Sequence, residues 1–335
     1  MRIMVAGGAG FIGSHVCERL LADGHEVVCL DNYLTGSRDN IAHLVPQERF
    51  RVVEVDVAKA PMIAADLILN LASPASPVDY DRLPVETMRA NALGTWRLLD
   101  VAQQVGAMLT FTSTSEAYGD PLVHPQPETY WGNVDPIGPR SCYDESKRFA
   151  EALIMASRRA TGVRASIVRL FNTYGPRMRV DDGRAIPEML TAALEGRPLV
   201  VHGDGSQTRS FCYVSDLVDG LLRVALDPGA DGEVFNVGNP AEISILELAD
   251  EIRRAVGSAS AIEFDERRQG DPERRRPDIT KIVERYGWEP TVELRAGLEA
   301  IAADFRARLP RRHPGTGRPE PGIGRAAVAV HEESL

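Results

Sequence analysis

The first 31 residues constrain the fold of this chain more than any other segment. Residues Arg2–Ala6 form a short apolar run of strand composition, and a glycine-rich turn, residues 7–13, leads into a segment of helical pattern, Ser14–Ala22. A second apolar run, Glu26–Leu30, ends at the carboxylate of Asp31. This order of strand, glycine-rich turn, helix, strand and acidic residue predicts a parallel βαβ unit whose helix N-terminus can face a pyrophosphate.

The turn and the acidic residue together indicate a bound dinucleotide. Glycines permit a tight turn and a close approach of the backbone to phosphates, and a carboxylate at the end of the second strand accepts hydrogen bonds from an adenosine ribose. Asp31 is followed by Asn32 rather than by an arginine, and its negative charge repels a 2′-phosphate. The segment therefore favours NAD over NADP, with an ordinary βαβ unit as the alternative.

Apolar runs and helical patterns continue to alternate beyond Asp31. This alternation predicts an α/β fold, a Rossmann-type doubly wound parallel sheet, in which ligands bind beyond the carboxyl ends of the strands. The further predicted strands are 51–55, 66–71, 107–112 and 165–170, and the clearest predicted helices are Pro84–Val105 and Ser141–Thr161.

The pattern changes after Leu170, where glycine and proline become frequent and short strands mix with short helices. We expect residues 1–170, with 212–240, to form the NAD-binding Rossmann domain. Residues 171–310 then supply mainly a smaller, interleaved α/β substrate-binding domain. Residues 311–335 are rich in Pro, Gly and Arg, a composition typical of a disordered tail.

Composition argues against several classes of partner. The net charge of −10 over 335 residues disfavours nucleic-acid binding, so a phosphate-bearing ligand would need local arginines such as Arg169, Arg177, Arg184 and Arg209. No apolar run is long enough to span a bilayer, and the chain starts directly with a strand. The cysteines are scattered without metal-ligand or redox spacing. We therefore expect a cytoplasmic protein with no membrane partner and no metal.

A tyrosine and a lysine lie four residues apart in the predicted helix Ser141–Thr161. Tyr143 and Lys147 share one helix face, where the ammonium can lower the pKa of the phenol so that it exchanges a proton with an alcohol near neutral pH. The predicted strand 107–112 runs into a hydroxyl-rich segment that includes Thr114. A hydroxyl at such a strand end can hold the substrate oxygen that Tyr143 protonates.

The glycine-rich turn, Asp31, the strand-end hydroxyls and the Tyr143–Lys147 pair together resemble the extended short-chain dehydrogenase/reductase family, whose members act on nucleotide sugars. The resemblance runs from Met1 to about Leu309. Within the family, several stretches are similar to the members that decarboxylate UDP-glucuronate to UDP-xylose with a tightly bound, recycled NAD. These stretches are residues 70–77, 112–116, 119–148, 169–176, 203–209 and 270–279.

The resemblance implies a role for each matching position. Thr114, Tyr143 and Lys147 would perform the hydride-transfer chemistry, and Glu116 and Arg275 the decarboxylation, although Arg275 stands in a run of three arginines. Ser115, Asn172, Arg209 and Arg275 would contact the UDP-sugar. The residues implied to bind NAD, besides Tyr143 and Lys147, are Gly7, Gly10, Phe11, Ile12, Gly13, Asp31, Asn32, Asp56, Val57, Leu71 and Ala72. The family also implies a homodimer.

Some positions discriminate between relatives. A 4,6-dehydratase of the family carries an aspartate where this chain has Ser115, and 4-epimerases usually lack a glutamate at Glu116. A 4-epimerase, another NAD-dependent nucleotide-sugar enzyme and a non-catalytic NAD-binding protein stay open as alternatives. Ser146, Glu188 and His202 differ from the expected pattern, which leaves UDP and dTDP both open as the nucleotide.

Overall fold

The computed structural model describes residues 1–266 and 274–309, and seven of its strands form one parallel sheet. The strands are β1 (Arg2–Ala6), β2 (Glu26–Asp31), β3 (Phe50–Glu54), β4 (Leu67–Asn70), β5 (Met108–Thr114), β6 (Ala165–Leu170) and β11 (Val234–Val237). Their order is β11-β6-β5-β4-β1-β2-β3, so the winding reverses between β1 and β4. The predicted Rossmann-type doubly wound sheet is confirmed.

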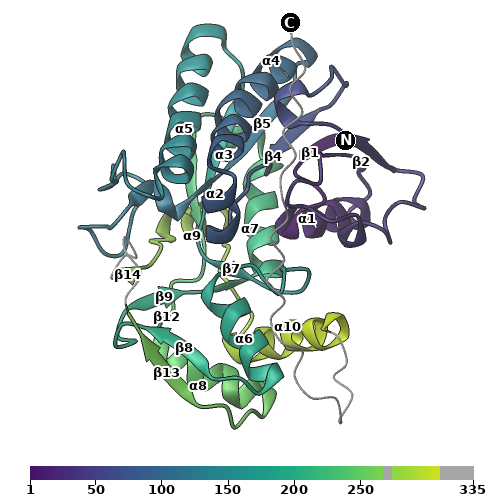
Figure 1. Cartoon of the computed structure of the whole chain (residues 1–335). Helices are drawn as coiled ribbons and strands as arrows, with labels where there is room; N and C mark the ends of the chain where they lie inside the picture. Colours follow the sequence, from purple (N-terminus) through teal and green to yellow (C-terminus); the bar gives the residue numbers. More distant parts are fainter. Residues whose placement is uncertain (267–273, 310–335) are drawn as a thin grey trace, which may run out of the picture.

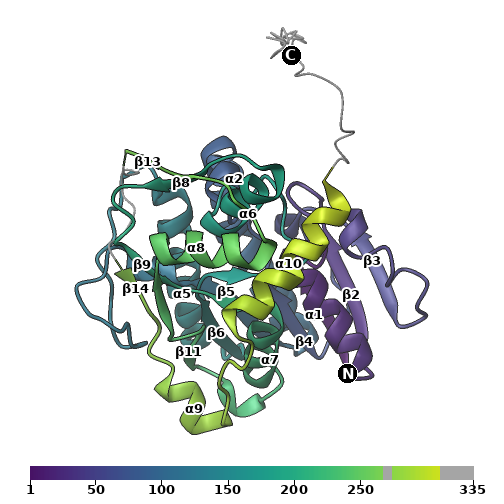
Figure 2. The same ribbon diagram turned by 90° about the horizontal axis from the view of Figure 1, so that it is seen from below.

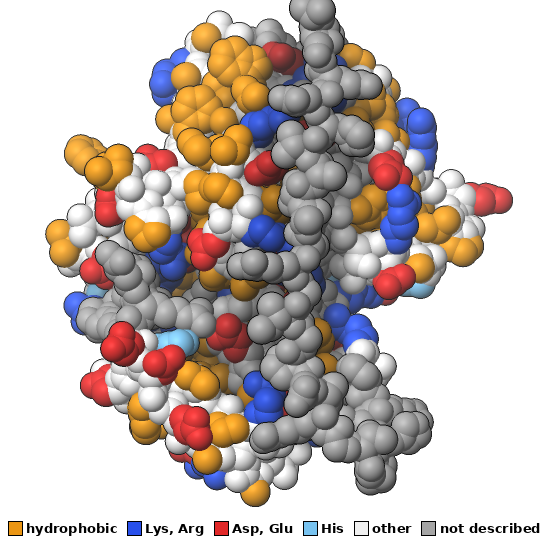
Figure 3. Space-filling view, viewed as in Figure 1, with side chains coloured by type: hydrophobic (Ala, Val, Ile, Leu, Met, Phe, Trp, Pro, Cys, Tyr) orange, Lys and Arg blue, Asp and Glu red, His pale blue; other side chains and the backbone are white. Residues whose placement is uncertain are grey.

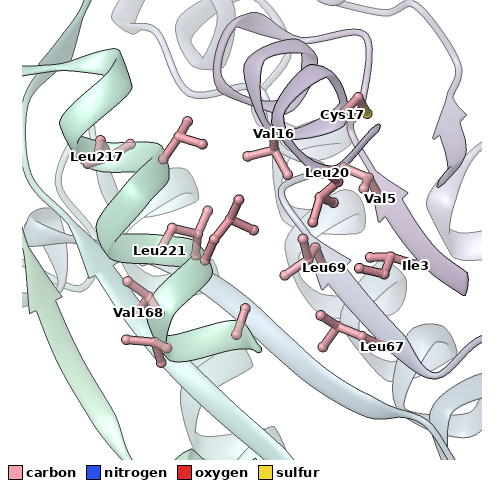
Figure 4. Packing of buried hydrophobic residues seen from close by; sticks show 14 of the residues in the cluster. Ile3, Val5, Val16, Cys17, Leu20, Leu67, Leu69, Val168, Leu217 and Leu221 are labelled. Carbon is pink, nitrogen blue, oxygen red and sulfur yellow. The ribbon is translucent and has the colours of Figure 1, made fainter. Parts of the chain in front are cut away.

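Helices cover both faces of the sheet because alternate strand residues point to opposite sides. Ile3 and Val5 of β1 pack toward α1 (Phe11–Ala22) and α7 (Val214–Ala225). Figure 4 shows this layer, with Val16 and Leu20 of α1 and Leu217 and Leu221 of α7 beside strand residues. Met4 and Ala6 face the opposite layer, formed by α3 (Pro84–Arg89), α4 (Thr95–Val105) and α5 (Ser141–Thr161).

The two helical patterns singled out in the sequence have different outcomes. Helix α5 has the predicted bounds and is followed by Gly162, whose φ of 73° is the left-handed conformation that closes a helix. The predicted helix 84–105 instead consists of α3 and α4 joined by a π-helical turn, Ala90–Gly94. Helix α1 begins at Phe11, three residues earlier than Ser14, because the glycine-rich turn is itself shorter than predicted.

The chain after β6 builds a second, smaller body below the large sheet (Figures 1 and 2). Its strands are β7 (Thr173–Tyr174), β8 (Leu199–His202), β9 (Thr208–Ser210), β10 (Cys212–Tyr213), β12 (Glu242–Ser244), β13 (Ile262–Asp265) and β14 (Arg274–Arg275). Its helices α6 (Ala185–Glu195), α8 (Ile245–Val256) and α10 (Leu294–Arg308) share a separate hydrophobic core. Strand β11 returns to the large sheet, where α9 (Thr280–Tyr286) lies against it. The exact division into domains stays a prediction.

The predicted tail, 311–335, and residues 270–272 of the family-like stretch lie outside the described residues. Within the described part of the chain, none of the helices combines the length and apolar character that a membrane span requires.

Candidate active site

Two adjoining cavities open at the carboxyl ends of the parallel strands. The larger, of about 950 Å³, is lined by the ends of β5 and β6, by α2 (Pro77–Arg82) and by the start of α6. The smaller, of about 220 Å³, lies over the ends of β1 and β2. Gly7, Gly10 and Leu71 line both, so the two cavities together offer one continuous site. This is where a doubly wound sheet binds its ligands.

The structure gathers every residue that the resemblance implies for NAD. Phe11, Ile12 and Gly13, with Tyr143 and Lys147, line the larger cavity. The smaller cavity is lined by Gly7, Gly10, Asp31, Asn32, Asp56, Val57, Leu71 and Ala72. Their roles toward the cofactor stay predictions.

The glycine-rich turn requires glycine at Gly7 and Gly13, because a side chain at either position would collide with neighbouring backbone. Gly7 has φ 78°, and a Cβ there would lie 2.8 Å from the backbone nitrogen of Ala72. A Cβ on Gly13 would collide with the carbonyl oxygen of Gly7. The Asp31 carboxylate accepts hydrogen bonds from the backbone N–H of Ala9 (2.9 Å) and of Tyr33 (2.8 Å). Asp31 is thereby fixed at the wall of the smaller cavity, where a ribose can meet it.

The two glycines predict different effects of alanine. Gly13→Ala is expected to lower both the thermal stability and the NAD affinity, the latter about tenfold or more, because the turn must move to admit the methyl group. Gly10→Ala is expected to weaken NAD binding with a much smaller loss of stability. Gly10 has an ordinary φ of −72° and lines both cavities, and its added Cβ would lie 3.2 Å from the Gly7 carbonyl oxygen. Calorimetric titration with NAD and thermal unfolding of the unliganded variants separate the two effects. Equal stability of the two variants would contradict this account of the turn.

The residues expected to transfer a proton lie together in the larger cavity. The hydroxyl of Thr114, the last residue of β5, hydrogen-bonds the phenol of Tyr143. The Lys147 ammonium donates to the carbonyl of Thr112 (2.8 Å) and lies 6.0 Å from the centre of the Tyr143 ring. The ring of Tyr80, from α2, stacks on Tyr143 with 5.4 Å between the centroids. The phenol is therefore fixed by a hydroxyl at its tip and an aromatic ring on its face.

The pKa values differ from the sequence-based expectation. Burial raises the pKa of Tyr143 to about 12, and the hydrogen bond from Thr114 opposes that rise only in part. Burial likewise lowers the pKa of Lys147 to about 7. The pKa of Tyr143 therefore does not fall toward neutral pH as the spacing to Lys147 led us to expect, because the loss of hydration on burial is the largest effect on it.

Glu116 lies between two guanidinium groups. Arg275 donates to one carboxylate oxygen, and Arg140 lies 2.6 Å from the other. Although burial opposes ionisation, the two arginines lower the pKa of Glu116 to about 2. Within the run of three arginines, Arg275 is the buried one, at 3% exposure, and it also donates to the carbonyl of Gly119. The structure therefore settles which of the three reaches the cavity wall.

The other candidate substrate residues divide into two groups. Ser115, Asn172 and Arg209 line the larger cavity, as do Arg177, Arg184, Glu188 and His202. Arg209 is paired in register with Arg275 across β9 and β14. Arg169 was a wrong candidate: it pairs with Glu151 at 2.6 Å and covers the ring of Tyr118, so it supports α5 rather than a ligand.

Sequence reasoning missed two residues of this site, Arg140 and Tyr80. Arg140 immediately precedes α5, one turn before Tyr143, and that spacing was a usable signal. Tyr80 comes from a short helix capped by Ser76, with no local pattern linking it to Tyr143. Among residues 1–266 and 274–309, no cluster of His, Cys, Asp or Glu could hold a metal ion.

Asp144, next to Tyr143, gives a prediction for stability against pH. Burial, followed by the charge of Glu116, raises its pKa from 3.8 to about 7, and its Oδ1 atom is buried with no hydrogen-bond partner among the described residues. Between these two pH values the folded protein keeps a proton that the unfolded chain loses, so the stability contribution of Asp144 falls as pH rises toward 7.

Asp144→Asn removes this titration. The unfolding free energy of the variant, relative to that of the wild type, is expected to rise by about 4 kcal/mol from pH 4 to pH 8. Urea unfolding at both pH values measures the difference. A stability difference that is the same at both values would contradict the raised pKa.

Comparison with known proteins agrees with this site. Residues 3–238 match the model of the NAD dependent epimerase/dehydratase family. UDP-glucuronic acid decarboxylase 5 of Arabidopsis thaliana is 50% identical over 92% of this chain and 90% of its own length. UDP-glucuronic acid decarboxylase 1 of Danio rerio is 47% identical over 97% of this chain and 77% of its own.

Solved structures give the same result for the fold. The UDP-glucuronic acid 4-epimerase of Bacillus cereus, in complex with UDP-glucuronic acid and NAD, superposes with a TM-score of 0.83 at 29% identity, over 92% of this chain and all of its own. DesIV, a dTDP-glucose 4,6-dehydratase of Streptomyces venezuelae with NAD and TYD bound, gives 0.82 at 29%, over 92% and 97% of the two chains. This chain therefore belongs to the NAD dependent epimerase/dehydratase family.

Proposed function

We propose that this protein converts UDP-glucuronate to UDP-xylose and CO2 with a tightly bound NAD that is regenerated in each turnover. The observation that carries the proposal is the Glu116–Arg275 pair in the same cavity as Thr114, Tyr143 and Lys147. Relatives 47–50% identical to almost the whole chain are UDP-glucuronic acid decarboxylases, which supports the same reaction.

NAD, held by the glycine-rich turn and Asp31, supplies a hydride acceptor and donor for C4 of the sugar. Tyr143 takes the proton of the C4 hydroxyl during oxidation and returns it during reduction, while Thr114 fixes the phenol and Lys147 supports it from the same helix face.

Oxidation at C4 places a ketone β to the C6 carboxylate. The C5–C6 bond then breaks, CO2 leaves, and the electron pair of that bond forms an enolate with the C4 oxygen. Tyr143 and Thr114 stabilise this oxygen by hydrogen bonding. C5 is reprotonated before C4 is reduced. No base has to remove a C5 proton. The site needs only to hold the C6 carboxylate of the sugar in place and to stabilise the enolate.

The same residues weigh against the related reactions. Elimination of water across C5 and C6 needs a general acid, and this chain has Ser115 where dehydratases of the family carry an aspartate. Epimerisation at C4 requires the 4-keto sugar to rotate within the site. That reaction does not require a carboxylate such as Glu116, which is paired here with two arginines. The 4-epimerase nonetheless acts on a sugar acid in the same fold, so product analysis must separate the two.

The diphosphate of the substrate would meet Arg209, with Asn172 at the adjoining turn. A guanidinium binds phosphate oxygens in pairs, which suits Arg209 to this role. The larger cavity also carries Arg177 and Arg184 on its wall, so local positive charge offsets the net charge of −10.

A second copy of the chain would cover an apolar face on α3, α4 and α5. Hydrophobic side chains gather in the upper part of the face in Figure 3, where these helices lie in Figure 1. Exposed members on these helices and the turn between them are Val85, Met88, Leu93, Trp96 and Phe149. Light scattering of the purified protein measures whether it is the homodimer that this face would form.

Incubation with UDP-glucuronate and NAD tests the reaction. We expect stoichiometric CO2 and UDP-xylose by NMR, with no net consumption of NAD. UDP-galacturonate formed without CO2 would replace the decarboxylase proposal by a 4-epimerase.

A further inference from the structure

We infer that Arg140 is a positioning residue for decarboxylation, acting through Glu116; the inference rests on the proposed function. Glu116 is the one acidic side chain at the end of β5, and two arginines from distant parts of the chain divide its carboxylate between them. Arg140 pairs with Oε2 at 2.6 Å, and Arg275 donates to Oε1. Each oxygen therefore has its own cation, and the carboxylate cannot rotate without breaking one ion pair.

Arg140 ties this carboxylate to the helix that carries the proton-transfer residues. It lies directly before α5, and its Nε is 3.9 Å from Oδ2 of Asp144, one helical turn further on. Its guanidinium lies 6.0 Å from the centre of the Tyr80 ring, which stacks on Tyr143. Arg140 thus contacts both Glu116 and the surroundings of Tyr143, whereas Arg275 reaches Glu116 from β14.

Because the Glu116 carboxylate is largely buried, it needs Arg140 as well as Arg275 to stay ionised. The Glu116 side chain is 15% exposed, and burial alone raises a carboxyl pKa. The charges of Arg275 and Arg140 are the two largest effects that lower it. With Arg140 removed, Glu116 keeps its ion pair with Arg275 but can rotate more freely, and its pKa rises.

This geometry separates the two halves of the reaction. Oxidation at C4 depends on Tyr143, Thr114 and Lys147, whereas loss of CO2 depends on the position and charge of Glu116. A change at Arg140 should therefore slow the release of CO2 more than it slows oxidation. A purely structural role for Arg140 would slow both steps alike.

The test is a single-turnover experiment on the NAD-loaded protein with UDP-glucuronate. Arg140→Gln is expected to release CO2 about 10- to 100-fold more slowly, the effect of losing one hydrogen bond to a charged group. The rate of C4 oxidation, followed by the absorbance of the reduced dinucleotide, should change less than about threefold. Arg140→Lys, which keeps the charge, should recover part of the loss.

Two comparisons make the result specific. Arg159→Gln, an exposed arginine on the same helix, is the matched control and should behave as the wild type. The double variant Arg140→Gln with Glu116→Gln should be no slower than Glu116→Gln alone, because Arg140 acts through Glu116. Circular dichroism confirms that each variant is folded; if Arg140→Gln is not, Arg140→Lys alone must show the selective loss.

Three results would overturn the inference. They are wild-type CO2 release by the Arg140 variants, equal slowing of both steps, and effects of Arg140 and Glu116 that multiply fully in the double variant. Absence of CO2 release from the wild type would instead overturn the proposed function, and the inference with it.

Discussion

Tyr143→Phe is expected to lower the rate of UDP-xylose formation about 10³-fold, the range for loss of a positioned acid–base group. The substitution removes the hydroxyl that bonds Thr114 but keeps the ring that stacks on Tyr80. The fold and the affinity for UDP-glucuronate should therefore change little. Initial rates of CO2 release and calorimetric titration with UDP-glucuronate measure the two quantities separately.

Tyr286→Phe is the matched control for this change. Its phenol also hydrogen-bonds a side chain, Asp227 at 2.8 Å, but it stands at the end of α9, outside the residues that line the two cavities. We expect its turnover to equal that of the wild type. A Tyr143→Phe variant with more than about a tenth of wild-type turnover would remove Tyr143 from the chemistry.

Glu116→Gln is expected to allow oxidation at C4 but to slow the loss of CO2 that follows it. CO2 release should fall by about 10²- to 10³-fold, since the variant loses the charge that both Arg140 and Arg275 hold. Tyr143 and Lys147 remain, so C4 oxidation should continue. The reduced dinucleotide and a 4-keto sugar acid should therefore accumulate together, detected by absorbance and by mass spectrometry of the quenched mixture.

Glu145→Gln removes a partly exposed carboxylate from the same helix as Tyr143 and serves as the control. It should neither slow CO2 release nor accumulate the keto acid. If Glu116→Gln released CO2 as fast as this control, the proposed role of Glu116 in decarboxylation would be contradicted. This conclusion would not depend on the result for Tyr143→Phe.

Local sequence patterns predicted the elements that carry the site. The glycine-rich turn fixes where β1 and α1 meet, and the left-handed Gly162 closes α5 where the pattern ended. Parallel strands need buried apolar runs, so their positions can be predicted from the sequence, with boundaries that differ by at most two residues. The break between α3 and α4 could not be predicted, because the π-helical turn contains no proline and no capping side chain to mark it.

Side-chain partnerships across the fold were harder to predict. Glu116 and Arg275 lie 159 residues apart, and only the resemblance to a family placed them together. Tyr80 could not be predicted, because no local pattern links its short helix to Tyr143, on whose ring it stacks. Arg140 could have been predicted from its spacing, since it lies one helical turn before Tyr143. The pKa of Tyr143 was also misjudged, since spacing along a helix reveals a nearby charge but not the loss of hydration around the phenol.

One measurement tests the central claim, that a single bound dinucleotide takes and returns the hydrogen at C4 while the sugar loses its carboxyl carbon. UDP-glucuronate carrying deuterium at C4 is incubated with the NAD-loaded protein in ordinary water, and the product is examined by NMR. We predict UDP-xylose with the deuterium retained at C4 and ordinary hydrogen at C5. A five-carbon product without deuterium at C4, or a labelled six-carbon acid as the only product, would contradict the account.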